Sequence, residues 1–141
     1  MNGEPAGKIL SQVNETNLYR FDQACRVNAM TLASRLGIDV KLNINFLPNA
    51  IYQPAVCIRS TLAAAGRLSF PIDRIVFEVT EGESIADHAK LVDVFREYRR
   101  LGFKTAIDDF GAGYAGLGLL ADFQPDYIKL DMKLVRGIDS S

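Results

Sequence analysis

The stretch Ile75-Val76-Phe77-Glu78-Val79-Thr80 is β-branched and aromatic, a composition that predicts a strand. An amphipathic helix is predicted next, from about Ile85 to Leu101, because apolar residues recur at intervals of three and four and Gly102 follows. A second strand is predicted from Lys104 to Asp108, shortly after this glycine. Strand, helix and strand in this order predict a βα unit, in which the two strands run parallel.

The same alternation continues on both sides of this unit, without a long linker, a repeat or a low-complexity segment. A turn is expected at residues 2–7, where glycine, proline and asparagine gather. Gly66 and Pro71 are expected to mark the exit from the helix that precedes the unit. The remaining predicted elements are helices at 15–36, 53–68 and 115–123 and strands at 40–46 and 127–131.

The predicted helix at 15–36 has one apolar stripe, which we expect to face the core. Its members follow one another at intervals of three or four residues, and Gly37 stands where a C-terminal cap belongs. They are Leu18, Phe21, Cys25, Ala29, Leu32 and Leu36.

Four predicted strands carry a polar residue near their C-terminal ends: Asn45, Glu78, Asp108 and Lys129. In a doubly wound sheet such positions usually face a helix layer and are apolar. In a (β/α) barrel they point into the mouth, where active sites form. We therefore predict the α/β class and a partial (β/α) barrel of the TIM type, with about four parallel strands alternating with helices.

The composition of the 141 residues argues against several classes of protein. Sixteen basic residues against seventeen acidic ones give a net charge of −1, without the basic tract that grips DNA or RNA. Apolar runs fall short of the roughly 18 to 20 residues that cross a bilayer, and we expect no signal peptide. Cys25 and Cys57 are expected to be two half-buried thiols in a reducing compartment. We expect a cytoplasmic domain without nucleic-acid or membrane partners.

The strand-end residues have the chemistry of a hard-metal site. Glu78, Asp108 and the adjacent Asp109 are carboxylates, which repel one another unless a divalent cation neutralises them. With the amide of Asn45 they are oxygen ligands of the kind that suits Mg²⁺ or Mn²⁺ rather than zinc. Lys129 would keep its charge beside them and orient a water molecule or stabilise a developing phosphoryl charge. The predicted chemistry is metal-assisted attack of water on a phosphodiester.

Each of these residues also has a structural explanation. Asn45 can form a turn, Asp108-Asp109 can cap the next helix, and Lys129 can be a solvated edge lysine. Glu81 carries a charge that favours the start of the following helix. Glu78 is harder to explain in this way, because burial of an unpaired carboxylate costs several kcal/mol. The strand-end groups together are harder to dismiss than any one of them alone.

Three motifs carry a resemblance to a known family. This chain resembles the EAL domain in the order and spacing of its central motifs. The motifs are Phe77-Glu78-Val79-Thr80-Glu81, Asp108-Asp109-Phe110-Gly111-Ala112-Gly113-Tyr114 and Lys129-Leu130-Asp131, the last followed by Val135-Arg136. The resemblance extends from the first predicted helix to the end of the sequence. It implies a TIM-like barrel that hydrolyses the bacterial second messenger cyclic di-GMP to linear pGpG, using two Mg²⁺ or Mn²⁺ ions.

The resemblance also implies a role for each matching residue. Lys129 matches the lysine that positions the attacking water, and Glu81 matches the glutamate that holds the Asp-Asp loop in place. Substrate-binding residues are left unassigned. The residues that match metal ligands of the family are Asn45, Glu78, Asp108 and Asp109, in agreement with the argument from the strand ends.

The sequence departs from the family pattern in ways that bear on activity. The Glu-Ala-Leu motif, whose glutamate is a metal ligand in the family, is absent, and so are the last strands with a further catalytic glutamate and a glutamine. Leu47 and Ala115 stand where the family often has serine, and neither change removes a ligand. We therefore expect residues 1–141 to form a partial EAL-type domain, the central portion of the barrel, with weak or absent hydrolysis.

Part of a barrel leaves two strand edges and an apolar face uncovered, which predicts a homodimer or larger oligomer. Two functions stay open: a cyclic di-GMP phosphodiesterase, or a non-catalytic module that binds the nucleotide or a protein partner. The retained carboxylates and Lys129 favour the first function, because such a cluster is costly without its metal. The residues missing from both ends of the family pattern favour the second.

Overall fold

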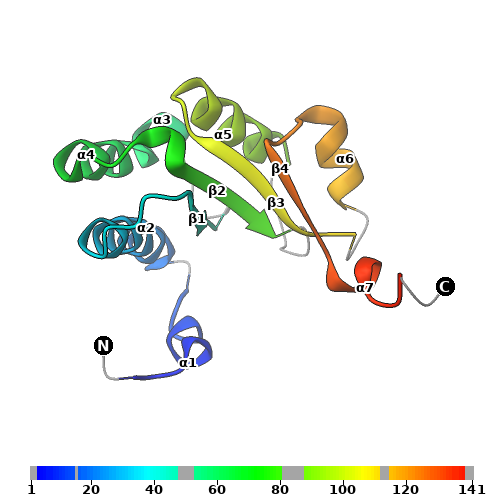
Figure 1. Cartoon of the computed structure of the whole chain (residues 1–141), viewed down its shortest axis with the longest axis horizontal. Coiled ribbons are helices and arrows are strands. Elements are labelled where there is room, and N and C mark those ends of the chain that lie inside the picture. The colour runs from blue at the N-terminus through cyan, green and yellow to red at the C-terminus, as the bar shows by residue number, and fades with distance from the viewer. Residues whose placement is uncertain (1–2, 15, 48–52, 81–87, 112–114, 139–141) are drawn as a thin grey trace.

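Four parallel strands form the sheet at the centre of the computed structural model, which describes residues 3–14, 16–47, 53–80, 88–111 and 115–138. In a doubly wound sheet the strand order reverses at a switch point, whereas in a (β/α) barrel consecutive strands are neighbours. The observed order follows the sequence, and helices alternate with the strands along the chain (Figure 1), which confirms the predicted fold class. The strands are β1 (Leu42–Asn45), β2 (Ile75–Thr80), β3 (Lys104–Phe110) and β4 (Tyr127–Leu130).

The helices agree in place with most of the predicted ones. Two short helices, α1 and α7, were not expected, and α1 begins inside the segment where a turn is predicted. Among the described residues, none of the helices has the length and apolar character needed to cross a membrane. The bounds are α1 (Ala6–Leu10), α2 (Leu18–Arg35), α3 (Pro54–Cys57), α4 (Arg59–Leu68), α5 (His88–Arg100), α6 (Ala115–Asp122) and α7 (Met132–Val135), with a 3₁₀ turn, η2, at Ile72–Arg74.

The segment predicted as one helix at 53–68 is two helices, α3 and α4, with Ile58 between them. α4 ends at Leu68, where the prediction placed the end of the helix, between Gly66 and Pro71. Ser69 caps the helix, with a left-handed φ of 53°. The backbone N–H groups at this cap donate to the carbonyls of Ala65 and Gly66, which satisfies the open end of the helix.

Aromatic side chains pack the outer face of the sheet against α5. The ring centroid of Phe77 lies 4.7 Å from that of Tyr98 and 6.1 Å from that of Phe46, and all three side chains are buried. Successive residues of a strand point to opposite faces of a sheet. Because Phe46 and Phe77 point to the helices, their chain neighbours Asn45 and Glu78 point to the other face.

The predicted core-facing stripe of α2 is wrong. Leu32 and Leu36, which belong to that stripe, are 51% and 73% exposed. The reason is an ion pair between Asp22 and Arg26, one helical turn apart, with 3.0 Å between Nε and Oδ2. Because the two charges neutralise each other, this face of the helix can be buried. The buried residues of α2 are Asp22, Arg26, Met30 and Ala33.

The two cysteines differ in exposure, contrary to the expectation that both are half-buried. Cys57, at the end of α3, is 0% exposed, whereas Cys25 on α2 is exposed, and both are free thiols. Partial burial, together with the charge of Asp22, raises the pKa of the Cys25 thiol. The Cys25 thiol therefore lacks the lowered pKa of a reactive cysteine.

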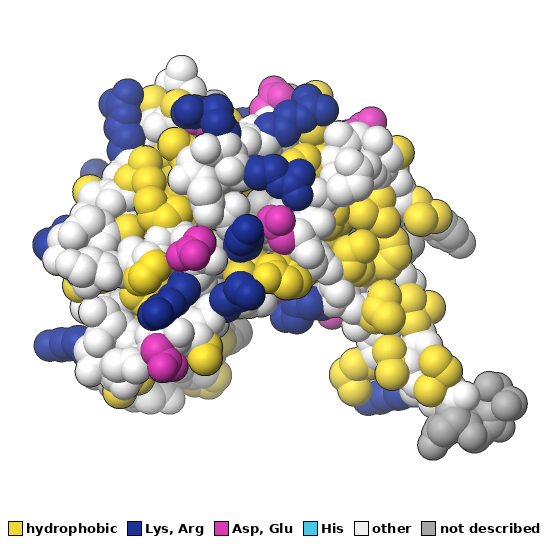
Figure 2. Space-filling view, turned by 45° about the horizontal axis from the view of Figure 1, so that its top comes forward, with side chains coloured by type: hydrophobic (Ala, Val, Ile, Leu, Met, Phe, Trp, Pro, Cys, Tyr) yellow, Lys and Arg dark blue, Asp and Glu magenta, His cyan; other side chains and the backbone are white. Residues whose placement is uncertain are grey.

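Large apolar side chains are exposed along β4 and α7. Figure 2 shows hydrophobic side chains gathered on the arm at the lower right, the side on which α7 lies in Figure 1. In the described part of the chain β4 is also an edge strand, so the apolar surface adjoins a row of backbone groups able to pair. The exposed residues of this surface include Ile128, Leu130, Met132, Leu134 and Val135.

Candidate functional site

Glu78 lies at the centre of the candidate site. β2 places it on the face of the sheet opposite the helices, and it is only 4% exposed. Its Oε2 accepts a hydrogen bond of 3.0 Å from Nδ2 of Asn43, and Nζ of Lys129 lies 3.3 and 3.4 Å from its two carboxylate oxygens. These partners supply the hydrogen bonds and the charge that a buried carboxylate requires.

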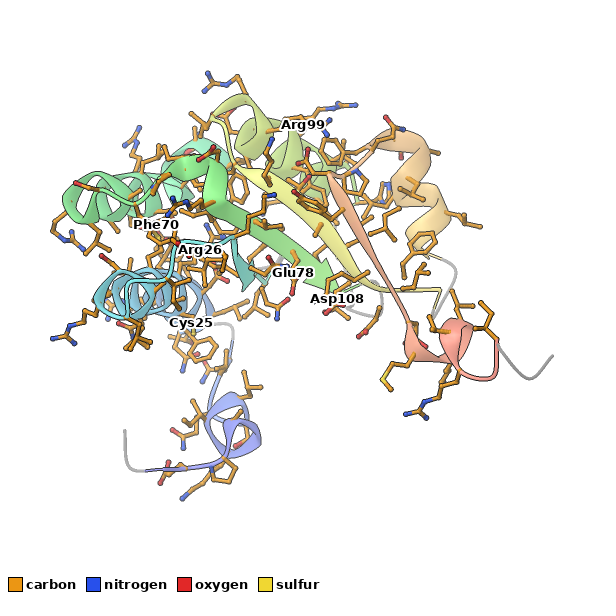
Figure 3. The ribbon with its side chains drawn as sticks, in the orientation of Figure 1. Cys25, Arg26, Phe70, Glu78, Arg99 and Asp108 are labelled. Atoms are coloured by element: carbon orange, nitrogen blue, oxygen red, sulfur yellow. The ribbon has the colours of Figure 1, made fainter. Side chains whose placement is uncertain are left out.

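Lys129 connects Glu78 to Asp108. Its Nζ also lies 3.5 Å from Oδ1 of Asp108, so one cation joins carboxylates from β2 and β3. Figure 3 shows Glu78 and Asp108 toward the same end of the sheet. Desolvation lowers the pKa of Lys129, but the neighbouring carboxylates of Glu78 and Asp108 outweigh it and raise the pKa above its usual value. The lysine is therefore charged at neutral pH.

Asp108 and the residue that follows it diverge at the end of β3. The backbone N–H of Asp109 donates a hydrogen bond of 2.9 Å to Oδ1 of Asp108. Asp109 has a left-handed φ of 53°, and the pairing of β3 with β4 shifts register between Ile107 and Phe110. Asp109 is exposed, and the ion pairs of the described residues do not join it to Lys129. The structure thus brings Asp108, but not Asp109, to the predicted cluster.

Asn45 is the neighbour of Glu78 across the β1–β2 ladder. The next backbone N–H, that of Phe46, donates to the carbonyl of Glu78 at 3.1 Å, which holds the two strand ends together. Asn45 also lines a cavity of about 440 Å³ together with Asn43 and Thr80. The amide that contacts the Glu78 carboxylate is that of Asn43, so Asn45 is adjacent to the cluster rather than part of its hydrogen bonds.

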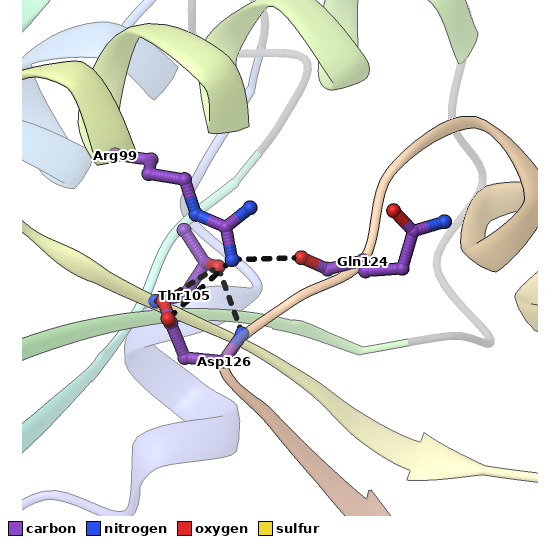
Figure 4. A network of polar contacts seen from close by, with 4 residues as sticks. All are labelled: Arg99, Thr105, Gln124 and Asp126. Carbon is purple, nitrogen blue, oxygen red and sulfur yellow. Dashed lines mark hydrogen bonds and ion pairs between the residues drawn. The ribbon is translucent and has the colours of Figure 1, made fainter.

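A network at the start of β4 places Lys129 (Figure 4). Oδ2 of Asp126 accepts hydrogen bonds from the backbone N–H and the hydroxyl of Thr105, at 2.8 and 3.2 Å. Nη2 of Arg99 lies 3.4 Å from Oδ1 of Asp126 and donates to the carbonyl of Gln124 at 3.0 Å. Helix α5, β3 and the segment before β4 therefore meet at one carboxylate, three residues before Lys129.

Two features of the site were missed by the sequence reasoning. Asn43 alternates with Lys41 and Asn45 on the polar face of β1, and this period of two was the signal that could have identified it. The Asp126 network has no comparable signal, because its partners lie far apart in the sequence. Glu81 lies outside the described residues, so its role stays a prediction.

The described residues fit a hard divalent cation in kind but supply only part of its coordination. Glu78 and Asp108 both lie within 3.5 Å of one cationic atom, Nζ of Lys129, so their carboxylates are close enough to share a cation. Their oxygens are the ligands that Mg²⁺ and Mn²⁺ prefer. Within the described ranges, however, His, Cys, Asp and Glu side chains form no group of three or more that could hold a metal.

The fold and the site together define a class of protein: a parallel β/α protein with carboxylates, amides and a lysine at the carboxyl ends of its strands, where barrel proteins bind their ligands. The sequence model of the EAL domain matches residues 3–141. The chain belongs to the EAL domain family.

Two curated relatives illustrate the range of this family. The blue light- and temperature-regulated antirepressor BluF of Escherichia coli K12 is 30% identical over 138 residues, which is 97% of this chain and 34% of BluF. The cyclic di-GMP phosphodiesterase PdeB of Shewanella oneidensis is 29% identical over 109 residues, which is 77% of this chain and 13% of PdeB. The chain therefore spans about a third, or less, of the length of these relatives.

Solved structures of EAL proteins share the fold of this chain. A standalone versatile EAL protein from Vibrio cholerae O395, in its c-di-GMP-bound form, superposes with a TM-score of 0.92 and 55% identity, over 100% of this chain and 60% of that one. A manganese and cyclic di-GMP complex of BlrP1 from Klebsiella pneumoniae superposes with a TM-score of 0.84 and 36% identity, over 96% of this chain and 35% of BlrP1. A calcium and cyclic di-GMP complex of BlrP1 matches equally well.

Proposed function

We propose that this chain binds cyclic di-GMP at the carboxyl ends of its strands and contributes to hydrolysis of one of its phosphodiester bonds to give pGpG. The observation that carries the proposal is the position of Lys129 between Glu78 and Asp108, at 3.3 to 3.5 Å. An ammonium group held by two carboxylates can neutralise charge that develops on a phosphoryl oxygen. The cyclic di-GMP complexes of the Vibrio cholerae protein and BlrP1 support the choice of ligand.

Four residues of this chain are proposed as oxygen ligands of Mg²⁺ or Mn²⁺. A bound divalent cation in such a site lowers the pKa of a water molecule and polarises the phosphodiester. The manganese and calcium complexes of BlrP1 support a divalent cation. Asp109 would have to turn its side chain from solvent toward Asp108 to take part. The proposed ligands are Asn45, Glu78, Asp108 and Asp109.

Lys129 is proposed to position the attacking water, since its charged Nζ is already directed at the two carboxylates by the Asp126 network. Asn43 orients the Glu78 carboxylate through Nδ2. Glu81 is proposed to hold the loop that follows Asp108 in place, as its counterpart does in the family.

Residues 1–141 are proposed to act as a partial EAL-type domain with weak hydrolysis or none. Even the four proposed ligands are fewer than the six or so that Mg²⁺ requires, and water would have to complete the shell. The limited donor set of the described residues supports this part of the proposal. Binding of cyclic di-GMP is accordingly the more robust readout, and hydrolysis is the second.

The test combines binding and turnover. Cyclic di-GMP affinity is measured by calorimetry with Ca²⁺, and pGpG formation by chromatography with Mg²⁺ or Mn²⁺. Asp108→Asn removes a proposed ligand, and Asp93→Asn, an exposed residue of α5, is the matched control. We expect Asp108→Asn to abolish any turnover and Asp93→Asn to leave it unchanged. A folded chain that neither binds nor hydrolyses cyclic di-GMP would refute the proposal.

A second candidate function is a non-catalytic module that regulates a protein partner. The observation in its favour is the match to BluF, an antirepressor, which covers 97% of this chain. Cyclic di-GMP binding without turnover, unchanged by a change of metal, would support this function over hydrolysis.

We further propose that the chain forms a homodimer in which a second copy covers the apolar surface of β4 and α7. An edge strand beside exposed apolar residues is a surface that proteins usually cover. Light scattering after gel filtration should give a dimeric mass at micromolar concentration. Ile128→Lys should give a monomer, whereas Lys133→Met on the same arm should not. A well-folded wild-type monomer would refute the dimer.

A further inference from the structure

Arg26 is fully buried behind the two strands that carry Asn45 and Glu78. It is 0% exposed, and Figure 3 shows it between α2 and the sheet. The central carbon of its guanidinium lies 4.7 Å from the ring centroid of Phe77 and 5.8 Å from that of Phe46. One planar cation thus contacts aromatic side chains from β2 and from the residue directly after β1.

Asp22 joins this cation to the backbone at the end of β1. Its Oδ2 lies 3.0 Å from Nε of Arg26, and its Oδ1 accepts a hydrogen bond of 3.0 Å from the backbone N–H of Leu47. The carboxylate side chain is 2% exposed. Burial raises the pKa of Asp22, and the Arg26 guanidinium and the Leu47 N–H oppose that rise. Helix α2 is therefore fixed through Oδ1 of Asp22 to the backbone of Leu47, two positions after Asn45, while Oδ2 holds the Arg26 guanidinium.

The alternation of the strands relates this pair to the candidate site on the opposite face. Phe46 follows Asn45 in the chain, and Phe77 precedes Glu78. Because neighbouring strand residues point to opposite faces, a contact that holds both aromatic rings from behind also fixes the two polar residues in front. Asn45 and Glu78 are partners in the ladder, so the contacts of Asp22 and Arg26 act on one cross-strand pair.

We propose that Asp22 and Arg26 are a positioning pair, which holds Asn45 and Glu78 in the geometry that the candidate metal site needs. The expected loss of metal affinity rests on the proposed function. The placement of the end of β1 against β2 by this pair does not depend on it.

Stability alone does not account for the pair. A buried ion pair gains little over well-packed apolar residues of similar volume, and its replacement by such residues is often neutral or stabilising. Outer-shell residues that orient metal ligands typically change metal affinity or activity 10- to 100-fold when they are mutated. The two roles therefore predict different outcomes when the pair is replaced by apolar residues.

The decisive variant is the double substitution Asp22→Leu with Arg26→Met. We expect it to fold and to bind Mn²⁺ at least 10-fold more weakly than the wild type, measured from free Mn²⁺ by electron paramagnetic resonance. Val94→Ala, a buried change on α5, is the control for a general loss of packing. It should leave Mn²⁺ affinity within about twofold, at a temperature where both variants are folded by circular dichroism.

A metal-free measurement keeps the inference separate from the proposed function. Amide hydrogen exchange by nuclear magnetic resonance should become at least 10-fold faster at Phe46, which donates to the Glu78 carbonyl, relative to Ile107 in β3. The side-chain amide signal of Asn43 should move as its contact with Glu78 loosens. If the wild type binds no Mn²⁺, the proposed function fails and exchange alone decides the inference.

Arg26→Lys serves if the double variant does not fold. Lysine keeps the charge beside Asp22 but lacks the planar group that contacts the rings. We expect the same direction of change in both measurements, smaller in size. A folded variant of either kind with wild-type exchange at Phe46 and an unmoved Asn43 signal would overturn the inference, and so would unchanged Mn²⁺ affinity in a chain that binds the metal.

Discussion

The Asp126 carboxylate accepts a hydrogen bond of 2.8 Å from the backbone N–H of Thr105, which joins the segment before β4 to the start of β3. This contact determines where β4 begins along its neighbour. Lys129 follows three residues later, so its reach to Glu78 depends on a bond made at the opposite end of the strand. The position of Lys129 at the candidate site is thus set partly by residues that do not contact the site.

Asp126→Ala should lower the free energy of unfolding by about 2 to 3 kcal/mol, because it leaves the buried backbone N–H of Thr105 without its acceptor and removes the ion pair with Arg99. Urea unfolding followed by circular dichroism measures the change. Asp122→Ala, which removes an exposed aspartate paired with His88, should stay within about 1 kcal/mol. Equal losses in the two variants would contradict the anchoring role of Asp126.

Lys129→Met should destabilise the chain by about 1 to 2 kcal/mol in the presence of a chelator, since Glu78 stays buried and loses its counter-charge. Mn²⁺ should recover this loss, because a divalent cation can replace the ammonium group and stabilises the state that binds it. Thermal unfolding with and without Mn²⁺ measures both effects. Lys133→Met, an exposed substitution on α7, should show neither. A Lys129→Met chain that Mn²⁺ does not stabilise would argue against metal binding at Glu78.

The strands and their polar ends were predictable because each depends on local sequence. A run such as 75–80 predicts its own strand, and the residues Glu78, Asp108 and Lys129 are brought together by parallel strands that end at the same edge. The predicted strand at 40–46 was too long: β1 covers only Leu42–Asn45. Local alternation continues past the residues that find a partner strand, so it overestimates the paired length.

The buried face of α2 could not be predicted from hydrophobic periodicity. Asp22 and Arg26 enter the core as a neutralised pair whose partners, Phe77 and the N–H of Leu47, lie far away in the sequence. The direction of Asp109 was equally hidden, since it depends on a left-handed backbone and a register shift at the end of β3. In both cases tertiary contacts override a pattern that is correct in isolation.

The two free thiols should react at different rates with a thiol reagent such as DTNB. In the native chain at pH 8 we expect one fast reaction at Cys25, which is exposed, and a second only on unfolding, because Cys57 is fully buried in the core. The raised pKa of Cys25 should make this fast reaction slower than that of a free cysteine. Cys25→Ser should remove the native reaction. Two thiols of equal reactivity in the folded chain would contradict the burial of Cys57.

Tyr98 should make the chain less stable as the pH rises above 10. Burial raises the pKa of its phenol to about 12 in the folded state, an effect that the nearby Arg26 guanidinium opposes, whereas the unfolded chain has the ordinary value of 10.0. Because the folded state keeps the proton longer, the contribution of Tyr98 is fully present below about pH 10 and is lost progressively as the pH rises from 10 to 12. Two pKa units correspond to a loss of about 2 to 3 kcal/mol.

Urea unfolding at pH 8, 10 and 11.5 measures this loss of stability. Tyr98→Phe keeps the ring but has no proton to lose, so it separates this loss from the titration of lysines. The difference in unfolding free energy between the two proteins should shift with pH in favour of the phenylalanine variant, and a difference that stays constant from pH 8 to 11.5 would show that Tyr98 titrates normally.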